Sequence, residues 1–154
     1  MRTKTILASV FAFVAGVGLA SAADPQLGTW KLNEGKSKLD PAITKNTTVV
    51  YAVAGDSVKV TVDGVDKDGK ASHNEWTGKF DGKEYAVTGD PTSDVRAYKK
   101  VDANTLELTA RKGGAVTLTG HIAVSADGKS RTVTVTGTDP AGKKVTSTAV
   151  YDKQ

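Results

Sequence analysis

The fold is decided by a short stretch of strictly alternating residues, Val58-Lys59-Val60-Thr61-Val62-Asp63. In an extended chain these valines lie on one face and the polar residues on the other, because successive side chains of a β-strand point to opposite sides. The same alternation recurs at residues 105–109, 116–119 and 132–136, and it is rich in valine and threonine, whose branched side chains suit a pleated surface. Strands with one apolar and one polar face are typical of antiparallel sheets that have one face in water.

Short turn sequences separate these stretches, among them Asp-Gly-Lys at residues 68–70, 81–83 and 127–129. Glycine adopts the positive φ that tight hairpin turns require. The turns recur at intervals of about a dozen residues, as in all-β domains. The pattern predicts about ten strands, at residues 28–33, 45–54, 57–66, 71–80, 83–88, 94–101, 104–111, 115–125, 130–138 and 144–152.

Strands joined by short turns tend to be neighbours in the sheet, so we expect an all-β, antiparallel, up-and-down meander. An open sheet of this size would expose two long edges, and closing the sheet into a β-barrel of about 8–10 strands removes them. A two-layer β-sandwich is the alternative architecture.

Residues 1–22 have the layout of a secretory signal peptide. Arg2 and Lys4 form a basic start, an uncharged apolar segment follows, and Ala20-Ser21-Ala22 supplies small residues for the peptidase. The apolar segment is shorter than the roughly 20 residues that span a bilayer, so we expect cleavage after Ala22 and no stable membrane anchor. The sequence therefore predicts a single domain at residues 23–154, in the periplasm or secreted.

Composition excludes several classes of function. The chain of 154 residues contains no cysteine, which excludes disulfides, thiolate metal sites and cysteine catalysis. Its formal net charge of +4 falls by two when Arg2 and Lys4 are removed, and the lysines are dispersed, whereas nucleic-acid binding needs a clustered basic surface. The only histidines, His73 and His121, lie far apart without a serine-nucleophile motif or zinc-ligand spacing. We therefore expect no enzyme activity, no metal, no cofactor and no nucleic-acid partner.

A family resemblance begins at Gly28-Thr29-Trp30 on the first predicted strand. This G-x-W resembles the first-strand motif of lipocalins and their calycin relatives, and the wider stretches 28–33, 36–38, 59–66 and 150–153 resemble small secreted bacterial proteins with lipocalin-like domains. The resemblance implies a barrel around a small apolar ligand, closed at one end by Trp30 with a basic residue of the last strand packed across it. Lys153 is the candidate for that residue, although the family usually has arginine there, and Gly28 belongs to the same structural set.

Arg96 and Tyr98 lie two apart on one predicted strand, so their side chains share a face. A buried arginine beside a tyrosine hydroxyl can bind a carboxylate, because the guanidinium fork matches its two oxygens. Some fatty-acid-binding calycins use an R-x-Y pair in this way, on a later strand. The competing arrangement, favoured by the cost of burying an arginine, turns Val95 and Ala97 inward and Arg96 outward.

Trp76 and Tyr85 are further candidates for the wall of a ligand pocket, although such aromatic residues are as readily explained as core. The other inward rows are mainly valine, leucine, alanine and threonine. Residues of this size would leave space inside a barrel of about ten strands.

Two functional hypotheses follow. The first is an exported, non-enzymatic carrier that holds a small hydrophobic or amphipathic molecule inside the barrel. The alternative is a module with a filled core that binds another envelope protein or a glycan through its outer surface.

Overall fold

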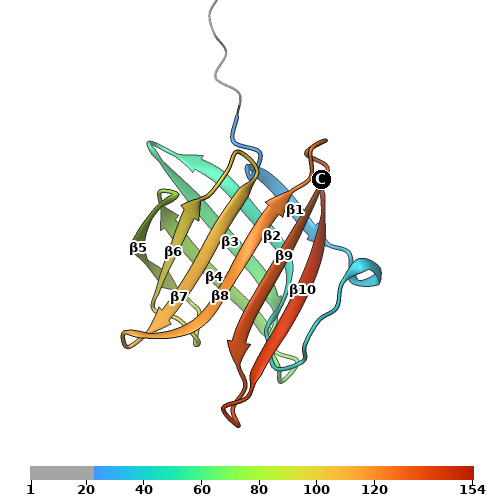
Figure 1. Cartoon of the computed structure of the whole chain (residues 1–154), viewed down its shortest axis with the longest axis vertical. Coiled ribbons are helices and arrows are strands. Elements are labelled where there is room, and N and C mark those ends of the chain that lie inside the picture. The colour runs from blue at the N-terminus through green and yellow to red at the C-terminus, as the bar shows by residue number, and fades with distance from the viewer. Residues whose placement is uncertain (1–22) are drawn as a thin grey trace, which may run out of the picture.

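A computed structural model describes residues 23–154, and the predicted signal peptide at residues 1–22 lies outside this range. Ten antiparallel strands run through the described part in chain order (Figure 1). They are β1 (Gly28–Leu32), β2 (Lys45–Ala54), β3 (Ser57–Val65), β4 (Ala71–Gly78), β5 (Asp81–Thr88), β6 (Val95–Lys100), β7 (Thr105–Lys112), β8 (Ala115–Val124), β9 (Ser130–Thr138) and β10 (Lys144–Lys153). Within residues 23–154 the only helical segment is a single 3-10 turn, η1 (Glu34–Lys36).

The ten strands form one closed barrel. Each strand pairs with its neighbours in sequence, and β1 closes the ring by pairing with β10 through Trp30↔Lys153 and Leu32↔Tyr151. The predicted antiparallel meander and its closure are therefore confirmed, and the β-sandwich alternative is wrong. Period-two patterning also places the inner face correctly, because Val60 and Val62 are buried inside the barrel while Lys59 and Asp63 are exposed.

One predicted turn is misplaced. The sequence Asp81-Gly82-Lys83 predicts a hairpin, but in the structure β5 already begins at Asp81 and the chain turns at residues 79–80. Gly82, with φ of +78°, instead forms part of an irregularity in the β5–β6 pairing, between Asp81 and Glu84. Beyond this turn, β4 and β5 pair only at Glu75↔Thr88 and Trp76↔Val87, so this is the most weakly joined seam of the barrel.

The alternating strand directions give the barrel two different ends. At one end the segment before β1 crosses the barrel: the Gln26 side-chain amide donates to the carbonyl oxygens of Asn104 (3.3 Å) and Ile122 (3.4 Å), and Trp30 Nε1 donates to the Gln26 carbonyl (2.9 Å). Trp30, Leu106 and Gln26 are fully buried there, so side chains fill this end. We call it the Trp30 end.

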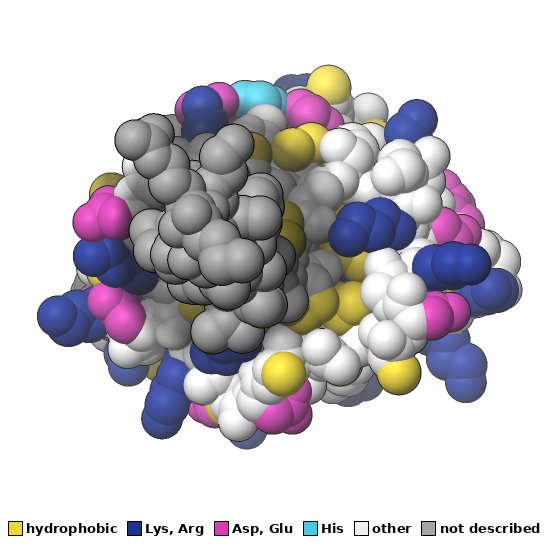
Figure 2. Space-filling model, turned by 90° about the horizontal axis from the view of Figure 1, so that it is seen from above, with side chains coloured by type: hydrophobic (Ala, Val, Ile, Leu, Met, Phe, Trp, Pro, Cys, Tyr) yellow, Lys and Arg dark blue, Asp and Glu magenta, His cyan; other side chains and the backbone are white. Residues whose placement is uncertain are grey.

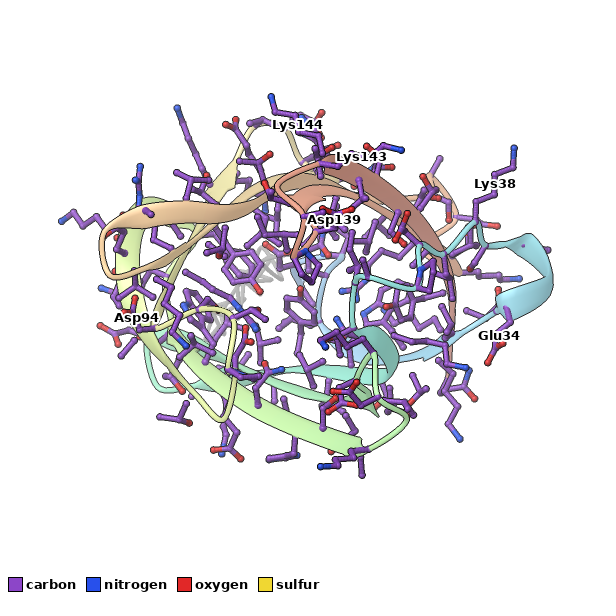
Figure 3. The ribbon with its side chains drawn as sticks, turned by 90° about the horizontal axis from the view of Figure 1, so that it is seen from below. Glu34, Lys38, Asp94, Asp139, Lys143 and Lys144 are labelled. Carbon is purple, nitrogen blue, oxygen red and sulfur yellow. The ribbon has the colours of Figure 1, made fainter. Side chains whose placement is uncertain are left out.

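The opposite end carries the β3–β4, β5–β6, β7–β8 and β9–β10 connections. Figure 3 views the barrel from this side, with Asp94, Asp139 and Lys143 around the opening and Glu34 to one side. We call it the open end.

The outer surface of the Trp30 end carries both signs of charge, and in the coloured part of Figure 2 basic and acidic side chains are interspersed around the periphery. No helix among residues 23–154 has the length and apolar character needed to cross a bilayer.

Candidate functional site

The barrel encloses an inner cavity of about 110 Å³. Its wall is mainly aliphatic, and several polar side chains also reach it. The aliphatic residues include Val49, Val60, Val62, Leu108, Ile122, Val133 and Val135, and the polar ones include Tyr51, Arg96, Tyr98, Arg131, Ser147 and Tyr151. A volume of this size accommodates several water-sized groups.

A larger hollow of about 620 Å³ lies at the open end. Residues of the turns line it, including Asp66, Gly89–Thr92, Lys112 and Thr138. The hollow shares five wall residues with the inner cavity, namely Ile43, Thr44, Asn46, Arg96 and Leu118. The two spaces therefore adjoin, and these shared residues form the junction between a polar mouth and an apolar interior.

Arg96 points inward at this junction, so the arrangement that turned it outward is wrong. Its side chain is only 11% exposed, and Nη2 lies 2.6 Å from Oδ2 of Asp90 while Nη1 donates to Oδ1 of Asn74 at 3.0 Å. Burying an arginine is tolerated here because a carboxylate and an amide satisfy the guanidinium. Asp90 lies on the β5–β6 connection and Asn74 lies on β4, so both partners come from outside β6.

Asp90 is held in its charged form. Burial by itself would raise the pKa of this carboxyl, but hydrogen bonds from Ser93 and from the Thr92 backbone, together with the charge of Arg96, lower the pKa below its ordinary value. Arg96 and Asp90 thus form an ion pair whose charges already compensate each other.

The four candidate ligand-binding residues separate into two pairs. Arg96 and Tyr98 both line the inner cavity, as a shared strand face requires. Trp76 and Tyr85 line neither space; the Trp76 ring packs against Tyr98 (4.7 Å between ring centres) and edge-on against Tyr85 (5.6 Å). Trp76 and Tyr85 therefore belong to an aromatic cluster of the barrel wall, which also includes Phe80.

The candidate closing residues meet at the Trp30 end. Lys153 Nζ lies 5.3 Å from the centre of the Trp30 ring. Gly28 has φ of +125°, and a Cβ at this position would lie 2.8 Å from Lys153 Cε. Glycine therefore provides both the backbone conformation and the space for the lysine side chain.

Sequence reasoning missed Arg131, which is the most buried charged residue among those described, at 2% exposed. Its guanidinium carbon lies 5.1 Å from the ring centre of Trp30, 4.8 Å from that of Tyr51 and 5.0 Å from that of Tyr151. The signal was present: the alternation that turns Val133 and Val135 inward, continued two residues back, turns Arg131 inward as well. An arginine does pack across Trp30, but it comes from β9 and not from the last strand.

Neither histidine lies in the interior. His73 is exposed on the outer face of β4, with Nδ1 2.6 Å from Oδ1 of Asp63 and Nε2 3.5 Å from Oε1 of Glu75. His121 is exposed on β8. Among residues 23–154 no group of three histidine, aspartate or glutamate side chains is arranged to hold a metal ion.

The contacts of His73 predict its titration. The hydrogen bond to Asp63 raises the pKa of His73 above its ordinary 6.5, and the charges of Asp63 and Glu75 act in the same direction. The contact of protonated His73 with Asp63 therefore stabilises the folded protein. This stabilisation is complete below pH 6.5 and is lost as the pH rises through the folded pKa of His73. Asp63→Asn is expected to lower the His73 pKa, as measured by NMR titration of the imidazole protons. Asp68→Asn is the control, since that carboxylate pairs with Lys67 instead, and an unchanged His73 titration in Asp63→Asn would contradict the prediction.

Comparison with known proteins adds no assignment: no protein-family model matches the sequence, and no curated protein matches it.

Proposed function

We propose that this protein is an exported, non-enzymatic carrier that holds a small hydrophobic or amphipathic molecule inside a lipocalin-like barrel. The observation that carries the proposal is the pair of adjoining spaces, an apolar inner cavity and a polar mouth, inside a barrel with one filled end. Ligand sites are typically concave, mostly apolar and provided with a few polar groups that orient the ligand. Export is proposed from residues 1–22 and the lipocalin-like character from Gly28 and Trp30.

The same observation separates this proposal from the alternative interaction module. That alternative is a module with a filled core and no ligand cavity, whose partner binds the outer surface. A cavity costs stability, so its retention in the interior supports a carrier.

The proposal predicts that filling the junction blocks binding. Leu118 lines both spaces, so Leu118→Trp is expected to place an indole between the mouth and the inner cavity. With 8-anilinonaphthalene-1-sulfonate as the probe, the wild-type protein should show saturable fluorescence enhancement, and Leu118→Trp should weaken binding by about tenfold or more, corresponding to at least ~1.4 kcal/mol. Thr119→Trp is the matched control, because the neighbouring side chain is exposed on the outside of the same strand.

Circular dichroism and thermal unfolding test whether both variants are folded. Ala149→Leu, at another residue of the inner wall, provides a second obstruction should Leu118→Trp not fold. Absence of saturable binding by the wild-type protein, or equal binding by the blocked and control variants, would contradict the carrier proposal.

A further inference from the structure

The inner cavity contains a cation without a counterion. Arg131 is buried, yet its Nε and Nη1 atoms have no hydrogen-bond acceptor within residues 23–154. It also forms no salt bridge with any carboxylate of the described chain. Leaving buried donors of a charged group unsatisfied is costly, and each such group in a native structure calls for a physical explanation.

The surroundings of Arg131 do not neutralise it. Its nearest neighbours are the rings of Trp30, Tyr51 and Tyr151, which stabilise a cation through their π faces but carry no charge. Burial raises the pKa of both tyrosine hydroxyls, although the charge of Arg131 opposes the shift, so both remain protonated at neutral pH. The Lys153 ammonium, also near the Trp30 ring, adds positive charge.

Arg96, the other arginine of the cavity wall, differs in this respect. Asp90 and Asn74 already occupy its two terminal nitrogens. An acid group binding at Arg96 would have to compete with Asp90, whereas no carboxylate of residues 23–154 competes for Arg131. The charge left uncompensated in the interior is therefore at the inner end of the cavity.

We propose that Arg131 binds the carboxylate of a small amphipathic acid, which enters the barrel acid group first and leaves its hydrocarbon part toward the mouth. This inference rests on the proposed carrier function and specifies the ligand class and its orientation. A guanidinium N–H forms a charge-assisted hydrogen bond with a carboxylate oxygen, and such a bond is stronger than one between neutral groups. The aliphatic wall around them, including Val60, Val62 and Leu108, suits a hydrocarbon chain.

The test compares octanoic acid with octan-1-ol, which has the same hydrocarbon chain and no charge. Isothermal titration at neutral pH is expected to show that the wild-type protein prefers the acid. Arg131→Met, which keeps an unbranched apolar stem and removes the charged guanidinium, should weaken octanoate binding by roughly tenfold to a hundredfold and leave octanol binding nearly unchanged. Arg131→Lys should retain part of the preference, and Lys129→Met, an exposed lysine near the same strand, should retain all of it.

The outcomes are distinguishable. Loss of acid preference in Arg96→Met but not in Arg131→Met would overturn the inference and leave the carrier proposal intact. Unchanged octanoate affinity in Arg131→Met would show that Arg131 only closes the barrel, which also overturns the inference. Failure of the wild-type protein to bind either compound would overturn the inference, and it would overturn the carrier proposal as well if 8-anilinonaphthalene-1-sulfonate also fails to bind.

A measurement on the wild-type protein covers the case in which Arg131→Met does not fold. NMR of bound octanoate should show nuclear Overhauser contacts from the protons beside the carboxylate to the ring of Tyr151, and from the terminal methyl group to Leu118. The reverse pattern, with the methyl group near Tyr151, would overturn the proposed orientation.

Discussion

Replacing Trp30 with alanine is expected to lower the free energy of unfolding by about 3–5 kcal/mol, the range for removing a large buried aromatic side chain. Trp30 is 0% exposed and fills the end of the barrel opposite the mouth. Its indole packs near Arg131 and Lys153, and its N–H donates to the Gln26 carbonyl oxygen, which fixes the segment that crosses this end. Alanine would remove the aromatic surface from two cations, leave a large cavity and release that segment.

Urea unfolding followed by circular dichroism measures this effect. Trp30→Phe is the matched control, because phenylalanine retains a ring beside Arg131 and loses the indole hydrogen bond and some volume, and it should have a clearly smaller effect. A loss below about 1 kcal/mol in Trp30→Ala would contradict a role for Trp30 in closing the barrel, since it is the size of a mild surface or cap substitution.

The barrel could be predicted from the sequence because its determinants are local. Alternation such as that of residues 58–63 assigns the inner and outer face of a strand without knowledge of its partners, and short turns between strands determine which strands are adjacent. The misplaced turn at Asp81 shows the limit of this reasoning. Glycine with positive φ serves equally in a hairpin turn and in a β-bulge, and only pairing with β6 decides between them.

The candidate site was less accessible to sequence reasoning because it depends on contacts between different elements, which form only when the barrel closes. Nothing local to Arg96 indicates that Asn74 and Asp90 would meet its guanidinium, and without them the inward orientation looks too costly. Arg131 followed the local alternation but was not identified, since its significance depends on three rings from β1, β2 and β10. Trp76 lies on the inner side of the wall, yet the rings of Phe80, Tyr85 and Tyr98 pack against it, and Tyr85 is half-exposed with its hydroxyl donating to Asp81.

Removing the charge of Asp90 is expected to destabilise the protein by about 2–3 kcal/mol at neutral pH, somewhat less than for a fully buried ion pair because these side chains retain slight exposure. The Asp90 and Arg96 side chains are 12% and 11% exposed. Asp90→Asn preserves the shape of the side chain and leaves the Arg96 guanidinium in the wall of the cavity without its counterion. Asp56→Asn is the control: that carboxylate is 85% exposed and lies 3.3 Å from Lys79, and a surface pair of this kind contributes little.

The destabilisation should also depend on pH in a defined direction. Because the pKa of Asp90 is lowered in the folded protein, its contribution to stability is complete above the unfolded value of 3.8 and is lost as the pH falls through the folded pKa. Urea unfolding at a series of pH values should therefore show the full difference between the wild-type protein and Asp90→Asn at neutral pH, and a shrinking difference as the pH falls below about 4. A difference that stays constant into strong acid would mean that the substitution acts through packing of the β5–β6 connection, and the charge of the Arg96–Asp90 pair would then not be what holds Arg96 at the junction.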